Sequence, residues 1–414
     1  MRRPLVVGLL ATLATRVALI VATREPPRWD GYFYARFADA IAHGHGYAVV
    51  SADAAPRPTA FYPVGYPAAL AAALHVAADP RVAAALVNLV AALVAVVAVV
   101  AVAHRAGGEA GARRAGLAYA LYPGAVLWCG AAMTETLHGA LLAIALAATA
   151  LPQTDAGRRG GAVATGLALG AATLVRPQSL LLLPLATLGA RSWRERAVAM
   201  VLACVATAAV VGPWTARNCT RLDACALVST NGGSNLLIGT FPDARGGYRR
   251  PGAEDGCADV RGEVRRDRCM TQVARARIRD NPGQWLALDA MKLVGTFAWE
   301  HDPVSYLRGE RRDRFGPWAY GALIALCTAA WWALLAMAWR GLGRGRANDA
   351  SAVATRFAVG ALAATAFTHG VFLGADRYHL IVVPLLCVVA GIASTGRAKA
   401  QTAVRVPEGT SMLI

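Results

Sequence analysis

Residues 4–34 read PLVVGLLATLATRVALIVATREPPRWDGYFY, a long apolar run that ends at Thr23 and continues directly into a charged and aromatic segment. A helix of about 20 apolar residues spans the hydrocarbon core of a bilayer. Similar runs recur along the 414-residue chain, which is 56% hydrophobic and 16% charged and has a mean hydropathy of +0.42. These runs do not alternate as barrel strands would, and a backbone in lipid must satisfy its own hydrogen bonds. The sequence therefore predicts an all-α polytopic membrane protein.

The apolar runs are separated by short connectors that carry arginine. We predict about ten transmembrane helices. Several of the middle runs are short, so we expect tilt of neighbouring segments or local thinning of the bilayer. The predicted spans are residues 4–23, 82–104, 115–129, 135–151, 161–175, 177–190, 197–213, 317–339, 353–374 and 379–395.

The arginines of the connectors predict the topology. With the N-terminus in the cytoplasm, the basic connectors all fall inside, as the positive-inside rule requires. They contain Arg105, Arg113 and Arg114; Arg158 and Arg159; Arg191, Arg194 and Arg196; Arg340, Arg344 and Arg346; and Arg397 and Lys399.

Two further apolar stretches are predicted as helices at the outer surface, because counting either as a span would invert the basic connectors. They are residues 66–78 and 284–300. The second stretch is predicted to be an interfacial amphipathic helix. Its polar stripe consists of Asp289, Lys292, Thr296 and Glu300. The result is a single membrane domain over residues 1–414, with external loops at 24–81 and 214–316.

The net charge of +17 is almost entirely arginine, with Lys292 and Lys399 as the lysines. Cytoplasmic flanks account for much of this charge, so it is no evidence for nucleic-acid binding. Arg2 and Arg3 before an apolar core also resemble a signal peptide. The many later spans, and the lack of a small-x-small site before Arg24, favour a retained first span. We expect a multi-pass protein of the inner (plasma) membrane.

The second external loop contains Cys219, Cys225, Cys257 and Cys269. Four cysteines allow three pairings, of which Cys219–Cys225 with Cys257–Cys269 is the most local. An oxidising outer compartment permits disulfides, although the sequence leaves free thiols open. The spacing does not fit a zinc ribbon, and histidines are not found nearby.

Asp30 is the first candidate for chemistry, because it follows the first span almost immediately. Aspartate is favoured as a helix N-cap, which is the structural interpretation of this residue. The functional interpretation is a general base at the boundary between water and lipid, where partial desolvation tunes a carboxylate.

Four further charged residues are predicted at the outer face. Arg57 precedes a cluster of proline and aromatic residues, and it is either a headgroup anchor or a cation for phosphate. Glu135 caps the next span or has a charged partner at membrane depth. Arg176 and Arg377 occupy outer turns as anchors or ligands. Carboxylates among arginines suit an anionic amphiphile such as a lipid phosphate.

Arg16 differs from these residues because it falls inside the first span. An arginine at that depth must face the bundle interior or water. A structural ion pair is favoured over contact with a ligand.

The order of short motifs resembles the GT-C superfamily of membrane glycosyltransferases, in the branch with the protein O-mannosyltransferases and the lipid A aminoarabinose transferase. The motifs extend over nearly the whole chain. In order they are Trp29-Asp30-Gly31-Tyr32, Gly44-His45-Gly46-Tyr47, Arg57-Pro58, Tyr62-Pro63, Tyr66-Pro67, Met133-Thr134-Glu135, Leu174-Val175-Arg176-Pro177, Pro213-Trp214, Arg217-Asn218, Ser229-Thr230-Asn231-Gly232-Gly233, Asn235-Leu236, Arg377-Tyr378 and Pro384.

The resemblance implies inverting transfer of a sugar from a polyprenyl-phosphate donor, on the outer face, to a hydroxyl of a glycan, lipid or protein. Asp30 would match the catalytic base. Arg57 would contact the donor phosphate, although the branch usually has lysine there. The substrate-binding residues would further include Tyr62, Glu135, Arg176 and Arg377. Gly31 departs from an acidic pair after the span, so neither a metal nor another cofactor is expected.

Two other functions stay open from the sequence. A transporter or lipid flippase would distribute ionisable residues through its spans, often with repeat symmetry. Here the charges gather on one face, and Arg16 is nearly the only charge deep in a span. A catalytically inactive scaffold of the same fold is the second alternative.

Overall fold

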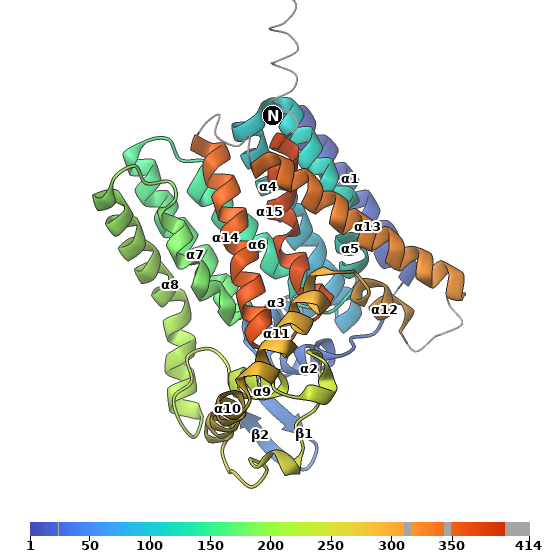
Figure 1. Ribbon diagram of the computed structural model, residues 1–414, viewed down its shortest axis with the longest axis vertical. Helices are drawn as coiled ribbons and strands as arrows, with labels where there is room; N and C mark the ends of the chain where they lie inside the picture. Colours follow the sequence, from blue (N-terminus) through green and yellow to red (C-terminus); the bar gives the residue numbers. More distant parts are fainter. Residues whose placement is uncertain (24, 310–315, 343–348, 394–414) are drawn as a thin grey trace, which may run out of the picture.

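The computed structural model describes residues 1–23, 25–309, 316–342 and 349–393. Within these ranges the molecule is a bundle of long helices with a cap of short helices and one hairpin at its lower end (Figure 1). The long helices of the bundle are α1 (Arg2–Thr23), α4 (Pro80–Leu121), α6 (Glu135–Ala150), α7 (Asp155–Val175), α8 (Trp193–Arg221), α13 (Pro317–Leu342), α14 (Asp349–Val371) and α15 (Val383–Ala393).

Six of the described helices are long and apolar enough to cross a membrane, judged by length and composition. They are α1, α4, α8, α13, α14 and the continuous segment Asp376–Ala393. The polytopic helical membrane class is thus confirmed, while the count of about ten spans stays a prediction. Arg344, Arg346, Arg397 and Lys399 lie outside the described residues, as do the last two positions of the predicted span 379–395.

The predicted spans 82–104 and 115–129 correspond to two limbs of α4, followed by the short helix α5 (Pro123–Trp128). The limbs meet at Gly108, whose φ of 68° is accessible to glycine at little steric cost. Beyond it the chain folds back, since Gly116 lies against Val100 and Gly8. The turn between the two antiparallel limbs is therefore at Gly108, and Arg113 lies in the second limb.

The predicted span 177–190 contains the 3-10 helix η1 (Pro177–Thr187) instead of an α-helix. Pro177 and Pro184 lack an amide N–H, so they remove hydrogen bonds that an α-helix would need. The last predicted span likewise begins with a 3-10 segment, η4 (Asp376–Val382), before α15. Every residue of α15 is buried, so this helix runs through the centre of the bundle. The η4 segment directly precedes it and is also largely buried.

Arg16 faces the interior of the bundle, as predicted, and is fully buried. It donates to the carbonyl oxygen of Ala120 at 2.8 Å and of Tyr119 at 3.2 Å. Its guanidinium also lies 5.0 Å from the centre of the Tyr119 ring. These partners join α1 to α4, so Arg16 is structural, through carbonyl groups and not through an ion pair.

Short helices lie between the bundle and the cap: α2 (Asp30–Ala42), α3 (Gly65–Leu74), α11 (Pro282–Phe297) and α12 (Asp302–Arg308) (Figure 1). The polar stripe of residues 284–300 faces the protein, and the apolar side of the helix faces outward. Lys292 and Glu300 are fully buried, whereas Leu286 is 62% exposed. Within the stripe Lys292 pairs with Asp289 at 2.8 Å, which offsets the cost of burying its charge.

The cap combines residues of the two loops that the sequence predicts to be external. Strands β1 (Ala48–Ser51) and β2 (Ala54–Pro58) form an antiparallel hairpin in the register Val49↔Arg57. The second loop supplies η2 (Pro242–Ala244), η3 (Ala253–Asp255), α9 (Gly232–Ile238) and α10 (Glu263–Asp280). Disulfides join Cys219 to Cys225 and Cys257 to Cys269, so the most local of the three pairings is the one formed.

Candidate active site

Asp30 is the first residue of α2, and its carboxylate is held by two side chains from distant parts of the chain. The Tyr62 hydroxyl donates to Oδ1 at 2.9 Å, and Nη2 of Arg377 donates to Oδ2 at 3.0 Å. The Asp30 side chain keeps 33% of its surface exposed. The N-cap position belongs to Trp29, so Asp30 is an acid of the first turn whose carboxylate is turned toward Tyr62 and Arg377.

Trp29 has a φ of 51°, in the left-handed region that residues other than glycine seldom adopt. Its ring lies 5.3 Å from that of Tyr306 and 6.3 Å from that of Trp128, centre to centre. The guanidinium of Arg377 is 5.5 Å from the Trp29 ring. Packing against these groups holds the unusual backbone conformation, which directs α2 so that Asp30 faces Arg377.

Glu135 begins α6 and is only 1% exposed. Arg176 donates from Nη2 to Oε1 of Glu135 and from Nε to the Thr134 hydroxyl, the latter at 2.8 Å. The indole N–H of Trp128 donates to Oε2 at 2.9 Å. A buried carboxylate needs such partners, so Glu135 holds Arg176 in a fixed position.

Arg377 connects the two carboxylates. Its Nε lies 3.9 Å from Oε1 of Glu135, while its Nη2 bonds Asp30. Tyr378 lies beneath both arginines, with ring-to-guanidinium distances of 5.1 Å to Arg176 and 5.1 Å to Arg377. Two carboxylates and two guanidiniums thus balance one another at one end of the bundle. An anionic ligand would find both cations already oriented there.

Tyrosines surround the Asp30 carboxylate. Burial, and then the nearby Asp30 charge, raise the pKa of Tyr62 and of Tyr34 well above the ordinary value for tyrosine. Both hydroxyls therefore stay protonated at physiological pH, so Tyr62 acts as a hydrogen-bond donor to Asp30.

The structure brings together five of the six residues that the sequence singled out: Asp30, Tyr62, Glu135, Arg176 and Arg377. The sixth, Arg57, lies on β2, a strand whose residues are all exposed, opposite Val49. The base of this hairpin is anchored to the second loop, where Glu263 accepts from the Thr59 hydroxyl and the Ala60 amide, each at 2.7 Å. Arg57 is thus outside the group of carboxylates and arginines.

Trp128 and Tyr306 are site residues that the sequence did not reveal. Trp128 bonds Glu135, and the Tyr306 hydroxyl accepts from the amides of Arg28 and Ala132. Their contacts join segments far apart in sequence, and no local pattern marks them. Tyr378 could have been predicted as a site residue, because it directly follows Arg377 in the motif Arg377-Tyr378.

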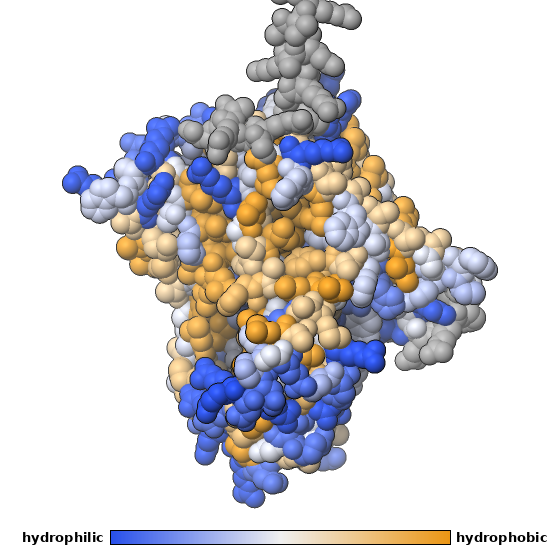
Figure 2. All heavy atoms as spheres, in the orientation of Figure 1, coloured by the Kyte–Doolittle hydropathy of each residue, from blue (hydrophilic) through white to orange (hydrophobic). Residues whose placement is uncertain are grey.

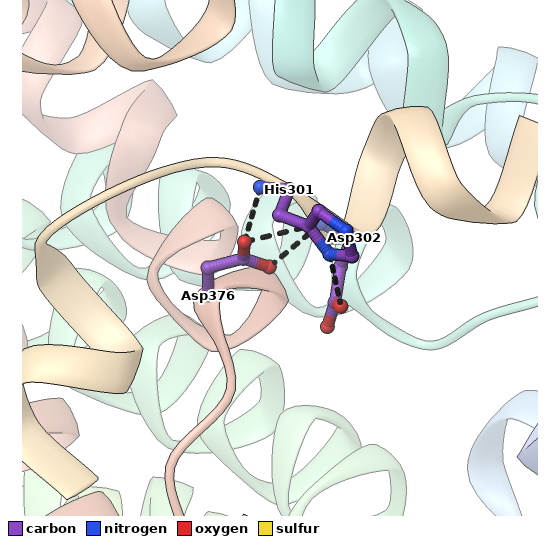
Figure 3. Close-up of side chains that lie close together, drawn as sticks. All are labelled: His301, Asp302 and Asp376. Atoms are coloured by element: carbon purple, nitrogen blue, oxygen red, sulfur yellow. Dashed lines mark hydrogen bonds and ion pairs between the residues drawn. The ribbon is translucent and has the colours of Figure 1, made fainter. Parts of the chain in front are cut away.

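Asp376 and His379 hold the backbone on either side of Arg377. The Asp376 carboxylate accepts from the His301 amide and, at 3.1 Å, from the Asp302 amide at the start of α12 (Figure 3). Nδ1 of His379 lies 2.6 Å from the Thr296 carbonyl oxygen, and its Nε2 lies 2.8 Å from Glu300. The Arg377 backbone is therefore tied to residues 296–302 from both sides.

His301, Asp302 and Asp376 place one possible metal-ligand atom each within 4.8 Å of one another. Figure 3 shows, however, that the Asp376 carboxylate is directed at the backbone amides of His301 and Asp302. Both Asp376 oxygens thus already accept hydrogen bonds, so the arrangement fits a helix cap better than a cation site, which needs oxygens free to coordinate.

No family model and no curated protein matches the chain at the level of sequence. Solved structures do match. The oligosaccharyltransferase AglB from Archaeoglobus fulgidus, in complex with an inhibitory peptide and a dolichol-phosphate, superposes with a TM-score of 0.57 at 12% identity, over 99% of this chain and 52% of AglB. The same enzyme tethered to an acceptor peptide gives 0.54 at 12% identity, over 97% and 50%. This chain thus spans about half the length of AglB.

ArnT from Cupriavidus metallidurans, in its apo state, aligns with a TM-score of 0.42 at 16% identity, over 97% of this chain and 78% of ArnT. The AglB superpositions cover almost all of this chain, including both external loops. The protein therefore shares its fold with the oligosaccharyltransferase AglB, as the resemblance seen in the sequence led us to expect.

Proposed function

We propose that this protein is a membrane glycosyltransferase that moves a sugar from a polyprenyl-phosphate donor to an acceptor hydroxyl on the outer face of the plasma membrane. The observation that carries the proposal is the Asp30 carboxylate, one-third exposed and within 3.0 Å of Arg377. Asp30 is the general base, and Arg377 and Arg176 bind the donor phosphate.

The reaction needs one proton transfer and one displacement. Asp30 takes the proton of the acceptor hydroxyl while that oxygen attacks the anomeric carbon of the sugar. The bond from the anomeric carbon to the phosphate oxygen breaks, and its electron pair leaves with the phosphate. A positioned base contributes about 10²–10⁴-fold to the rate. The products are an inverted glycoside, a polyprenyl phosphate and a protonated Asp30.

Arg377 and Arg176 would stabilise the departing phosphate. In the structure their charges are balanced by Asp30 and Glu135, which keep the guanidiniums oriented. A bound phosphate adds negative charge beside Arg377 and so competes with Asp30 for its N–H groups. Electrostatic stabilisation of developing charge by preorganised donors is usually the largest single contribution to catalysis. We assign the phosphate to these arginines before Arg57, because Arg57 lies on the exposed hairpin.

A lipid-linked donor is supported by the placement of the site. Asp30 begins α2 shortly after the end of α1, and Glu135 begins α6, so both lie at the cap side of helices apolar enough to cross a bilayer. A lipid-linked donor could place its phosphate there while its tail stays between the helices. The fold is shared with AglB, whose structure contains a dolichol-phosphate. The identities of the sugar and the acceptor are left open by this argument.

The proposal is tested with purified protein in lipid nanodiscs, a panel of polyprenyl-phosphate sugars and candidate acceptors. Release of polyprenyl phosphate is measured for the wild type, Asp30→Asn and Asp39→Asn. Asp39 is the matched control, because it lies on the same helix with a 67% exposed side chain paired to His43. We expect Asp30→Asn to lose transfer and Asp39→Asn to keep it. Equal turnover of Asp30→Asn and wild type would exclude the general base.

A transporter is the alternative that the structure disfavours. Arg16, the arginine deep in the first span, is bonded to carbonyls of Tyr119 and Ala120, with no exposed surface to line a path. A catalytically inactive scaffold predicts no turnover by the wild type with any donor of the panel, which the same experiment would reveal.

A further inference from the structure

A cavity lies at the opposite end of the bundle from Asp30. Its volume is about 200 Å³, and it opens between the ends of α6, η1, α7 and α8. The walls consist largely of small side chains, among them Ala148, Ala162, Ala186, Gly189 and Ala199. Four helices meet there without filling the space between them, because alanine and glycine leave room that larger side chains would take.

The cavity lies at the cytoplasmic boundary of the bilayer in the topology that the basic connectors predict. Arg158 and Arg159 lie near the start of α7, and Arg194 lies in the first turn of α8. Trp193 beside them is 74% exposed, as expected of an aromatic anchor at a membrane interface. Figure 2 shows hydrophilic side chains over the upper ends of α7 and α8, directly above a hydrophobic band.

One cation of the cavity is buried. Only 10% of the Arg158 side chain is exposed, and its Nη atoms bond Asp155 and, at 2.9 Å, the Gln153 carbonyl. Its Nε is buried without a hydrogen-bond partner, 3.5 Å from the nearest carboxylate oxygen of Glu195. This N–H faces Glu195 without a hydrogen bond of normal geometry, so an anionic oxygen at hydrogen-bond distance would bind it more strongly.

Two further cations stand at the rim. Arg159 and Arg194 are exposed, and within the described ranges neither forms an ion pair with a carboxylate. With Arg158 they give the lining three positive charges, against Asp155 and Glu195. The lining therefore has one more positive than negative side chain next to small apolar walls, which suits an anionic group attached to an apolar body.

We propose that this cavity binds the phosphate headgroup of an anionic phospholipid from the cytoplasmic leaflet. The phosphate would lie between Arg159 and Arg194 with one oxygen toward Nε of Arg158, and the glycerol would lie against the alanine walls. Basic pockets between membrane helices on the cytoplasmic side are suited to anionic lipid headgroups, and arginine binds phosphate through a planar fork of donors. The proposal is independent of the glycosyltransferase reaction.

The test is native mass spectrometry of the full chain with phosphatidylglycerol or phosphatidylcholine. The double variant Arg159→Ala/Arg194→Ala is compared with Arg105→Ala/Arg113→Ala, which removes the same charge from exposed arginines of the connector in α4. Loss of two charged hydrogen bonds predicts at least about tenfold weaker binding of phosphatidylglycerol by the first variant. The control variant should bind like the wild type, and phosphatidylcholine should bind weakly to all.

A second variant separates charge from shape. Ala190→Leu adds bulk to the cavity wall without changing any charge, and it should also weaken phosphatidylglycerol binding. Equal losses for both double variants would mean attraction to the whole basic surface and would overturn the proposal. Full retention by Arg159→Ala/Arg194→Ala and by Ala190→Leu would also overturn it. So would competition by millimolar inorganic phosphate alone, since that result assigns the cavity to a soluble phosphate.

Discussion

Arg377 donates to Asp30 at 3.0 Å, across 347 positions of sequence. The bond joins η4, which leads into the buried helix α15, to the start of α2. The same guanidinium lies 3.9 Å from Glu135. One side chain thus connects the proposed base to the carboxylate that holds Arg176, the second proposed phosphate ligand. The predictions below follow from this connection and from the contacts that maintain it.

Replacing Arg377 by lysine should lower the turnover of lipid-linked sugar by about 10²-fold, since a point charge cannot bond Asp30 and a phosphate together as the guanidinium fork does. Initial rates against donor concentration should show a lower kcat/KM. Arg36→Lys is the control, because Arg36 is an exposed arginine on the same helix as Asp30 and bonds Tyr32 and the Val50 carbonyl. Equal losses in the two variants would contradict a special role for Arg377.

Replacing Asp376 by alanine should reduce turnover and stability together, because it frees the His301 and Asp302 amides and releases the backbone beside Arg377. Loss of such a cap costs about 1 kcal/mol. Asp376→Asn retains an acceptor oxygen and should recover part of both losses. Hydrogen exchange of the segment Asp376–Val382 should rise in the alanine variant and stay near wild type in the asparagine variant. Unchanged exchange in the alanine variant would contradict the positioning role.

Asp267 should make the stability of the cap depend on pH. Burial raises the pKa of Asp267 to about 6, although its carboxylate accepts from the Gly233 amide at 2.6 Å. A carboxyl whose pKa is raised on folding contributes stability at pH values below its unfolded pKa, and that contribution is lost as the pH rises through about 6.

The check is thermal unfolding from pH 4 to pH 8 of the wild type and Asp267→Asn. Asparagine keeps an oxygen for the Gly233 amide without a titrating group, so the difference in Tm should shift in favour of the variant as the pH rises. Asp280→Asn, an exposed change at the end of the helix that carries Asp267, should show a constant offset from the wild type. A constant offset for Asp267→Asn as well would refute the assignment.

The two ends of the bundle should label from opposite sides of the membrane. Asp53→Cys lies in the turn of the exposed hairpin, and Gly160→Cys lies at the start of α7, where nothing is within 4 Å of the added Cβ. Both are made in a Cys204→Ser background, because Cys204 is an exposed free thiol. An impermeant thiol reagent applied to right-side-out vesicles should modify position 53 and spare position 160. Labelling of both from one side would reject the topology and place the proposed lipid cavity in the wrong leaflet.

The sequence by itself was sufficient for the membrane class and for much of the helix placement. Apolar length and arginine-rich connectors are local properties, so α1, α8 and α13 could be predicted from composition. Asp30 was recognisable because a carboxylate directly after an apolar span is unusual in any fold. The local disulfide pairing was also the simplest of the possibilities.

Only the tertiary structure decided which of the outer residues meet. Arg57 and Arg377 were equivalent as arginines predicted on one face, yet a hairpin carries the first outward, while the buried helix α15 fixes the second beside Asp30. The polar stripe of α11 was visible in the sequence, but its direction depends on the hydrogen bond from Lys292 to the Val371 carbonyl and on close packing against Gly374. Such choices rest on contacts between distant segments, whose energies no local pattern encodes.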